Sequence, residues 1–290
     1  MPTRRFMQLD VFADRALRGN PLAVVIDAEG IDSVTMQAFA RWTNLSETTF
    51  LLPPTTPQAD YRVRIFTPRQ ELPFAGHPSV GSAYAAIEAG LVETGKRALV
   101  QECAAGLLPV RVEGDGAARV IHVQAPPARI ASIDAGLRER LAAALPAALD
   151  EADTALVDNG PHWLVCDLQH ATAVRALAPD LAAIAALCEH NALVGVSVFG
   201  AETDGTAAMA VRAFCPADGI PEDPVTGSAN AAIMAVLGAR GDTRYGLRYR
   251  ASQGREVGRD GLVEVARDAA TGAITIGGAC ALTVRGELVI

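Results

Sequence analysis

Apolar residues in the first part of the chain recur with the spacing of short strands and one-sided helices. Apolar runs at 6–12 and 22–26 predict two strands, joined by a turn at 19–21 where glycine, asparagine and proline follow one another. Residues 61–66 alternate strictly between apolar and polar side chains, which predicts a strand with one face in water. An alanine-rich run over 78–88 predicts a helix, because the proline at its start lies where a missing N–H breaks no helical hydrogen bond.

Further segments complete this first half. Ser33 precedes a run whose apolar residues fall roughly on one helical face, which predicts a helix beginning after it. Residues 48–52 predict a strand, and apolar residues at 110–112 and 120–123 predict a strand pair. Two adjacent prolines disfavour both helix and inner strand within 124–128, so this segment is predicted to link two halves of the chain.

The second half repeats the order of elements found in the first. A Phe-x-Pro motif at 66–68 ends a strand and leads through a proline-containing loop to Gly76, which opens a helix of small residues. The same motif at 214–216 leads through a similar loop to Gly227, which opens another such helix. Because the two copies have nearly the same spacing, we expect two related domains. The remaining elements expected here are helices at 133–144, within 170–188 and at 226–238, and strands at 154–157, 162–167, 193–199 and 207–214, followed by several short strands.

Composition narrows the class of protein. Half of the 290 residues are hydrophobic and 20% are charged, a globular mixture that excludes disorder, collagen and a coiled coil. The formal net charge of −8 gives no attraction to phosphate backbones, so we expect no nucleic-acid partner. No stretch approaches the roughly 18 apolar residues of a membrane helix, and Asp10 interrupts the apolar start, so we expect neither a membrane span nor a signal peptide. Scattered cysteines without CxxC spacing predict reduced thiols in a cytoplasmic protein.

Each repeat leads to a helix that starts with glycine followed by small or polar residues. Unpaired N–H groups and the positive end of the helix dipole make such a start suitable for binding an anion or a developing oxyanion. Gly76, Gly227 and Ser228 are therefore candidates for substrate binding, since glycine also lets a ligand approach the backbone. The alternative is that these residues only end a loop and cap a helix, and the duplication favours the functional interpretation.

Three side chains near these motifs could carry or hold a proton. Glu47 lies between an apolar helix and an apolar strand, where burial would raise the pKa of its carboxyl group toward neutrality. His77 follows the first helix-opening glycine, and it could donate a hydrogen bond or titrate. Asp223 precedes the second helix-opening glycine by four residues. The structural alternatives are an exposed loop glutamate, a packed histidine and an Asp-Pro turn.

The sequence carries no common cofactor motif. No GxGxxG follows a strand and no GxxxxGKS/T occurs, so no nucleotide cofactor is expected. No HExxH and no Cys/His cluster indicates a metal. The segment 76–81 only approaches GxSxG and follows a proline-rich loop rather than a strand, which disfavours a serine hydrolase.

Four motifs in combination resemble the phenazine-biosynthesis PhzF-like isomerase family. They are Gly19-Asn20-Pro21, Ser46-Glu47-Thr48, Phe74-Ala75-Gly76-His77-Pro78 and the segment 222–230, in the family's order and spanning nearly the whole chain. The resemblance implies an α+β fold of two pseudo-symmetric, diaminopimelate-epimerase-like domains, each a mostly antiparallel sheet wrapped around a central helix. It also implies an N-terminal domain of residues 1–125 plus about 279–290, because the C-terminal strand returns to it, and a C-terminal domain of residues 126–278.

The same resemblance implies an activity and a set of site residues. The protein would be a homodimer that works without a cofactor or metal on a small carboxylate-bearing substrate of the dihydro-hydroxyanthranilate type, in a cleft between the domains. Glu47 would be the general acid/base. The residues that match the family's catalytic positions are Glu47, His77 and Asp223, and those that match its substrate-binding positions are Asn20, Gly76, Gly227 and Ser228.

The leading interpretation is an isomerase in which Glu47 removes a proton from an activated carbon and returns it elsewhere on the same face. Related racemases place a cysteine before each helix-opening glycine, whereas this sequence has Ala75 and Thr226 there, which disfavours a two-thiol racemase. An amino-acid racemase or epimerase that uses Glu47 and Cys215 stays open as an alternative. A non-catalytic protein that binds a small molecule is another, since it would keep the same cleft.

Overall fold

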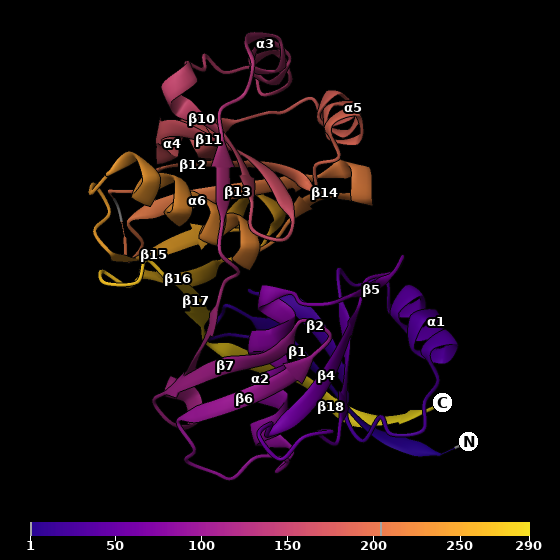
Figure 1. Ribbon diagram of the computed structural model, residues 1–290. Coiled ribbons are helices and arrows are strands. Elements are labelled where there is room, and N and C mark those ends of the chain that lie inside the picture. Colours follow the sequence, from indigo (N-terminus) through magenta and orange to yellow (C-terminus); the bar gives the residue numbers. More distant parts are fainter. Residues whose placement is uncertain (1, 204) are drawn as a thin grey trace. The chain divides into compact units, whose positions relative to one another are not determined.

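The computed structural model describes residues 2–203 and 205–290, and it divides into two compact units. Unit 1 comprises the chain up to Gln124 together with Gly277–Ile290, and unit 2 comprises Ala125–Ile276. The chain therefore leaves unit 1 and returns to it near its end. Each unit combines helices with a mixed, mostly antiparallel sheet (Figure 1).

Unit 1 contains both ends of the described chain. Its helices are α1 (Ser33–Thr43), α2 (Gly76–Glu88) and the 3-10 turn η1 (Gly116–Ala118). Its strands are β1 (Thr3–Val11), β2 (Asn20–Val25), β3 (Thr48–Leu52), β4 (Tyr61–Phe66), β5 (Glu71–Leu72), β6 (Ala98–Cys103), β7 (Gly106–Glu113), β8 (Val120–Gln124) and β18 (Cys280–Val289).

Unit 2 consists of the chain between the two segments of unit 1. Its helices are α3 (Ala135–Ala144), α4 (Ala171–Ala176), α5 (Leu181–Asn191) and α6 (Gly227–Arg240), with the 3-10 turns η2 (Glu151–Asp153), η3 (Pro216–Asp218) and η4 (Arg255–Val257). Its strands are β9 (Arg129–Ala131), β10 (Thr154–Asp158), β11 (His162–His170), β12 (Gly195–Ala201), β13 (Met209–Cys215), β14 (Ile220–Asp223), β15 (Arg248–Gln253) and β16 (Gly261–Arg267). The strand β17 (Ile274–Gly278) crosses the boundary back to unit 1.

The two units repeat the same strand pairing. In unit 1, β2 pairs parallel with β3, β3 antiparallel with β4, and β4 parallel with β6. In unit 2, β11 pairs parallel with β12, β12 antiparallel with β13, and β13 parallel with β15. The antiparallel pairs β1–β2 and β10–β11 precede these strands in the same relation. The pairing confirms the pseudo-symmetry that the repeated Phe-x-Pro and glycine motifs predict.

The helices α2 and α6 are the central helices of their units. α2 contacts β1, β2, β3, β4, β8 and β18, and α6 contacts β9, β10, β11 and β16, so strands surround each of them (Figure 1). Small residues make this close wrapping possible. At Gly81 of α2, a Cβ atom would lie 2.5 Å from Leu22 Cδ2 and 2.8 Å from Val11 Cγ2, so a larger residue would push the helix away from β1 and β2.

Several elements begin and end where their sequence patterns predict. The predicted strands 48–52 and 61–66 are β3 and β4, and α2 and α6 open at the two predicted glycines. The predicted start of the first helix is wrong by one residue. Asp32 caps α1 by accepting a hydrogen bond from Thr35 N at 2.7 Å, so Ser33 is already helical. The short strands expected after the last helix are present as β15, β16 and β17, and a longer strand, β18, follows them.

The strand β18 pairs antiparallel with β1 from Cys280 to Val289, with a shift of register between Gln8 and Leu9 of β1. Asp10 belongs to β1 and is buried, and its carboxylate accepts hydrogen bonds from the loop that follows β1 and from β18. Leu17 N donates at 2.9 Å and Gly19 N at 3.2 Å, while Thr283 Oγ1 of β18 donates at 2.6 Å. Asp10 thereby joins the loop that leads into Asn20 to the last strand of the chain.

Candidate active site

Glu47 is held at the start of a buried strand. α1 ends at Thr43, and Asn44 adopts a left-handed conformation with φ 53°, which turns the chain toward β3. A hydrogen bond between the hydroxyl groups of Thr43 and Thr48, whose oxygens lie 2.8 Å apart, spans the segment between α1 and β3. The side chain of Glu47, directly before β3, is only 16% exposed. It therefore differs from the exposed loop glutamate that was the structural alternative.

His77 lies beside Glu47. It is the second residue of α2, and its Nε2 lies 3.4 Å from Oε2 of Glu47. Burial lowers the pKa of the His77 imidazole to about 3, so the ring is neutral at pH 7. The contact thus joins a carboxyl group to a neutral imidazole rather than two full charges. A neutral histidine in this position can donate or accept a hydrogen bond.

The buried imidazole makes stability depend on pH. Because the pKa of His77 is below its unfolded value of about 6.5, its contribution to stability is complete above about pH 6.5 and is lost as the pH falls toward 3. Between pH 7 and pH 5 we expect the free energy of unfolding to fall by about 2 kcal/mol more in the wild type than in His77→Asn. Urea unfolding at the two pH values measures the difference.

The control for this measurement is His162→Asn, whose native side chain is 48% exposed. This variant should follow the wild type at both pH values. Parallel pH dependence in the wild type and His77→Asn would contradict a lowered pKa of His77.

Asn20 and Gly76 complete the group of predicted residues in unit 1. Asn20 begins β2, which runs parallel to β3, and its side chain is fully buried. Ser46 Oγ donates to Asn20 Oδ1 at 3.4 Å, which connects Asn20 to the residue preceding Glu47. Gly76 opens α2 after Ala75, whose methyl group cannot cap the helix. The N–H groups at the start of α2 therefore have no side-chain cap.

The predicted residues of unit 2 gather around the start of α6. Asp223 ends β14, is 8% exposed, and accepts a hydrogen bond on Oδ2 from Thr226 Oγ1 at 2.5 Å. Gly227 and Ser228 are the first two residues of the helix, and Asn159 Nδ2 donates to the backbone oxygen of Ser228 at 2.9 Å. Thr226 is the N-cap residue, yet its side chain makes no capping hydrogen bond. The start of α6 therefore resembles that of α2.

A buried ion pair supports the loop that carries Asp223. Arg212 Nε and Nη2 donate to the two carboxylate oxygens of Glu222 at 2.9 Å and 2.8 Å, and both side chains are under a tenth exposed. Behind the loop, Gly254 has φ +97°, and a Cβ atom there would lie 2.5 Å from the oxygen of Pro224. The loop thus rests against a backbone position that requires glycine.

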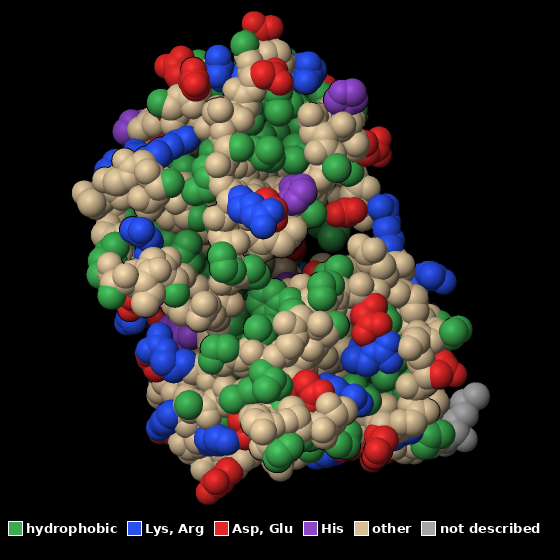
Figure 2. All heavy atoms as spheres, viewed as in Figure 1, with side chains coloured by type: hydrophobic (Ala, Val, Ile, Leu, Met, Phe, Trp, Pro, Cys, Tyr) green, Lys and Arg blue, Asp and Glu red, His purple; other side chains and the backbone are tan. Residues whose placement is uncertain are grey.

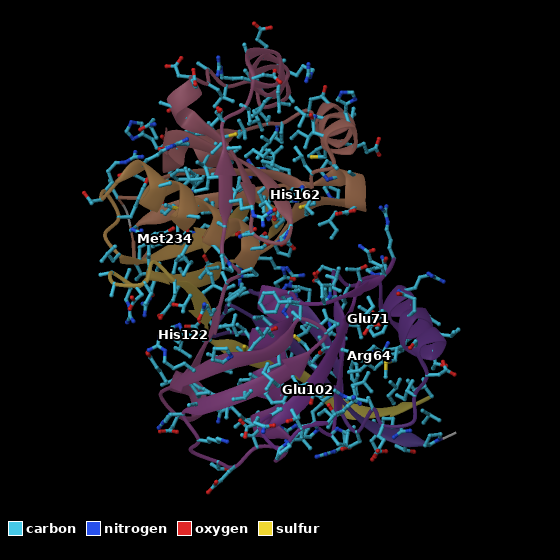
Figure 3. All side chains as sticks on the ribbon, viewed as in Figure 1. Arg64, Glu71, Glu102, His122, His162 and Met234 are labelled. Atoms are coloured by element: carbon cyan, nitrogen blue, oxygen red, sulfur yellow. The ribbon has the colours of Figure 1, made fainter. Side chains whose placement is uncertain are left out.

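A hollow of 570 Å³ on unit 1 contains none of the predicted site residues. Arg64, Glu71 and Glu102, labelled in Figure 3, are among the residues that line it. Arg64 donates to both carboxylate oxygens of Glu71 at 2.7 Å and 2.6 Å, and Glu102 accepts from Thr55 N at 2.7 Å. Because these charges already have partners, the hollow is a weaker candidate for proton transfer than the pair formed by Glu47 and His77.

Other candidate features give little support to alternative chemistry. Within residues 2–203 and 205–290, no three His, Cys, Asp or Glu side chains are placed to hold a metal ion. No helix in the described part of the chain has the length and apolar character needed to cross a bilayer.

Cys215 is a buried cysteine at the end of β13 that forms no disulfide. On the face shown in Figure 2, acidic and basic side chains are intermixed over each unit.

Comparison with known sequences gives matches over nearly the whole chain. A family model described as phenazine biosynthesis-like protein matches residues 9–286. Antisense-enhancing sequence 1 of Schizosaccharomyces pombe is 36% identical over 295 residues, covering 99% of this chain and 99% of the relative. Trans-2,3-dihydro-3-hydroxyanthranilate isomerase of Pseudomonas aeruginosa is 37% identical over 257 residues, covering 88% and 87% of the two chains. Relatives that are named isomerases support an isomerase here.

Comparison with solved structures confirms the α+β fold. A phenazine biosynthesis protein of the PhzF family from Bacillus anthracis aligns with a TM-score of 0.86 at 26% identity and covers 100% of both chains. A hydroxyproline epimerase from Agrobacterium vitis aligns with a TM-score of 0.67 at 16% identity, covering 99% of this chain and 91% of that chain. The second likeness concerns the fold alone.

Proposed function

This chain belongs to the phenazine-biosynthesis-like family PhzC-PhzF, and from that premise we propose a cofactor-independent isomerase that moves a proton within a small carboxylate-bearing substrate. The observation that carries the proposal is the 3.4 Å contact between Glu47 and His77 at the uncapped start of α2. A carboxylate there can accept a proton from carbon, while N–H groups at the helix start stabilise the negative charge that develops.

Glu47 is the general acid/base in this proposal. It takes a proton from a carbon next to an alkene or carbonyl, and the electron pair left behind shifts through the conjugated bonds. The protonated Glu47 then returns the proton to another carbon on the same face, so that product and substrate are isomers. The neutral His77 donates a hydrogen bond to the substrate or to Glu47 without introducing a second full charge.

Unit 2 supplies the groups that hold the substrate in this proposal. Asp223 accepts a hydrogen bond from an amine or hydroxyl of the substrate, and the N–H groups that follow Gly227 bind its carboxylate. The 8% exposure of Asp223 and the uncapped start of α6 support these roles. In unit 1, Asn20 and Gly76 are assigned to substrate binding.

The first substrate to test is trans-2,3-dihydro-3-hydroxyanthranilate, after which the Pseudomonas aeruginosa relative is named. We expect the protein to isomerise it in D₂O, with NMR reporting the shifted double bond and any deuterium that enters carbon. Activity should persist in the presence of a strong chelator and of iodoacetamide. Binding without isomerisation would instead favour a binding protein. Racemisation of an amino acid that iodoacetamide abolishes would favour the alternative that uses Cys215.

Gly227→Val tests the start of α6 as a substrate-binding site. A branched side chain at the first helical position would obstruct the N–H groups that follow it, so affinity for the dihydroanthranilate should fall at least about tenfold, or 1.4 kcal/mol. The fold should survive, because Gly227 does not have a positive φ and its backbone conformation is open to other residues. Calorimetric titration in a Glu47→Gln background measures affinity without turnover.

The matched control is Gly136→Val, which alters a glycine in the first turn of α3. Its affinity should equal that of the background protein. If Gly227→Val also binds as tightly as the background protein, the start of α6 does not contact the substrate.

A further inference from the structure

The side chain of Gln253 lies fully buried at the end of β15, beneath the start of α6. Its Oε1 accepts hydrogen bonds from Thr226 N at 3.0 Å and from Asn230 Nδ2 at 3.1 Å. Its Nε2 donates to Asp223 O at 3.0 Å and to Thr226 Oγ1 at 2.9 Å. The orientation of the amide follows from its backbone partners, because an N–H can only donate and a carbonyl oxygen can only accept.

This orientation determines where the hydroxyl proton of Thr226 points. Because Gln253 Nε2 donates to Oγ1, the hydroxyl acts as acceptor on that side and directs its own proton to Oδ2 of Asp223 at 2.5 Å. A threonine at an N-cap ordinarily accepts a hydrogen bond from the second or third N–H of its helix. Thr226 makes no such bond. Gln253 and Asp223 thus hold the Thr226 hydroxyl in an orientation in which it does not cap α6.

In unit 1, the central helix α2 also begins without a side-chain cap. Gln101 of β6 is also fully buried, and its Nε2 donates to Oγ of Ser79 at 3.0 Å, while Tyr61 Oη donates to its Oε1 at 3.2 Å. β6 pairs parallel with β4 as β15 pairs parallel with β13, and each glutamine bonds to the fourth residue of its central helix. The N-cap residue of α2 is Ala75, whose methyl group cannot accept a hydrogen bond from the helix. Both helix starts thus lack a side-chain cap, and in unit 2 this requires Gln253.

We infer that Gln253 is a positioning residue: it turns the hydroxyl of Thr226 onto Asp223 and so leaves the first N–H groups of α6 open to the substrate. The inference rests on the proposed function for its catalytic consequence. Its structural part, the diversion of Thr226 from capping, can be tested without any substrate.

Gln253→Met removes the amide but keeps the length of the side chain. The oxygen of Thr226 is then free to accept the N–H of Ala229, the third residue of α6. We expect hydrogen exchange at the Ala229 amide, followed by NMR, to slow about tenfold. With trans-2,3-dihydro-3-hydroxyanthranilate we expect KM to rise about tenfold and kcat to change less, since the lost groups bind the carboxylate before and during reaction. Gln101→Met is the matched control, and it should leave Ala229 exchange and KM unchanged in the folded protein.

A double variant separates diversion of Thr226 from general loss of packing. Thr226→Ala in the Gln253→Met protein removes the hydroxyl that would cap the helix. Fast exchange at Ala229 should then return, together with at least about a third of the lost affinity for the substrate.

If Gln253→Met does not fold, Gln253→Glu replaces it in the same measurements, because glutamate also removes the donor to Thr226. Unchanged Ala229 exchange, or equal changes of KM in Gln253→Met and Gln101→Met, would overturn the inference. If the wild type fails to act on the dihydroanthranilate, the proposed substrate is wrong, and the exchange measurement still decides the role of Gln253.

Discussion

Replacing Glu47 by glutamine is expected to lower turnover of trans-2,3-dihydro-3-hydroxyanthranilate about 10²–10⁴-fold, the usual contribution of a positioned acid or base. Glutamine keeps the shape of the side chain whose Oε2 lies 3.4 Å from His77 Nε2, but it cannot accept a proton from carbon. Binding should therefore stay within a few-fold of the wild type. Steady-state kinetics measure turnover, and calorimetric titration measures binding.

Glu71→Gln is the matched control. This carboxylate also belongs to unit 1, but it pairs with Arg64 at the 570 Å³ hollow. The control should retain nearly full activity. A Glu47→Gln protein with more than a tenth of wild-type activity would exclude Glu47 as the acid/base, and loss of activity in Glu71→Gln alone would move the site to the hollow.

Arg212→Met is expected to lower the free energy of unfolding by about 3–5 kcal/mol, the range typical of breaking a buried ion pair by removing one partner. Glu222, whose side chain is 9% exposed, would keep its charge without the guanidinium. The backbone oxygens of Leu177 and Val174 would also lose the donor that Arg212 Nη1 provides at 2.6 Å and 3.2 Å. Urea unfolding at pH 7 measures the loss.

The control for this variant is Arg250→Met. Arg250 donates to Glu264 at 2.9 Å, but its side chain is 52% exposed, so its removal should change stability by less than about 1 kcal/mol. Adding Glu222→Leu to Arg212→Met should restore part of the stability, because no unpaired buried charge then remains. Similar small losses in Arg212→Met and Arg250→Met would show that burial does not set the strength of the Arg212 pair.

The sequence pattern predicts those parts of the fold that local chemistry determines. The strand at 61–66 follows from its alternation, and the two central helices open at Gly76 and Gly227 as their motifs predict. Sequence alone does not distinguish Asp32 from Ser33 as the cap of α1, because both are good N-cap residues and only the bond from Thr35 N identifies Asp32. The pairing of β18 with β1 depends on contacts between opposite ends of the chain, which no local pattern encodes.

The candidate site, too, can be predicted from the sequence only in part. Glu47, His77 and Asp223 could be singled out because each adjoins a distinctive motif. The contact between Glu47 and His77 could not be predicted by spacing, since it arises from the packing of α2 against β3. Gln253 carries no motif of its own. The one signal for it was another glutamine, Gln101, at a similar place in the first repeat.

The link between Asp10 and Thr283 bears on the order in which a newly made chain matures. Unit 1 obtains β18 only after every residue of unit 2 has been added to the growing chain. The loop before Asn20 receives the hydrogen bond from Thr283 to Asp10 only at that stage. Contacts between such distant residues also close slowly. The sheet of unit 1, and with it the loop before Asn20, can therefore be completed only after the whole of unit 2 has been synthesised.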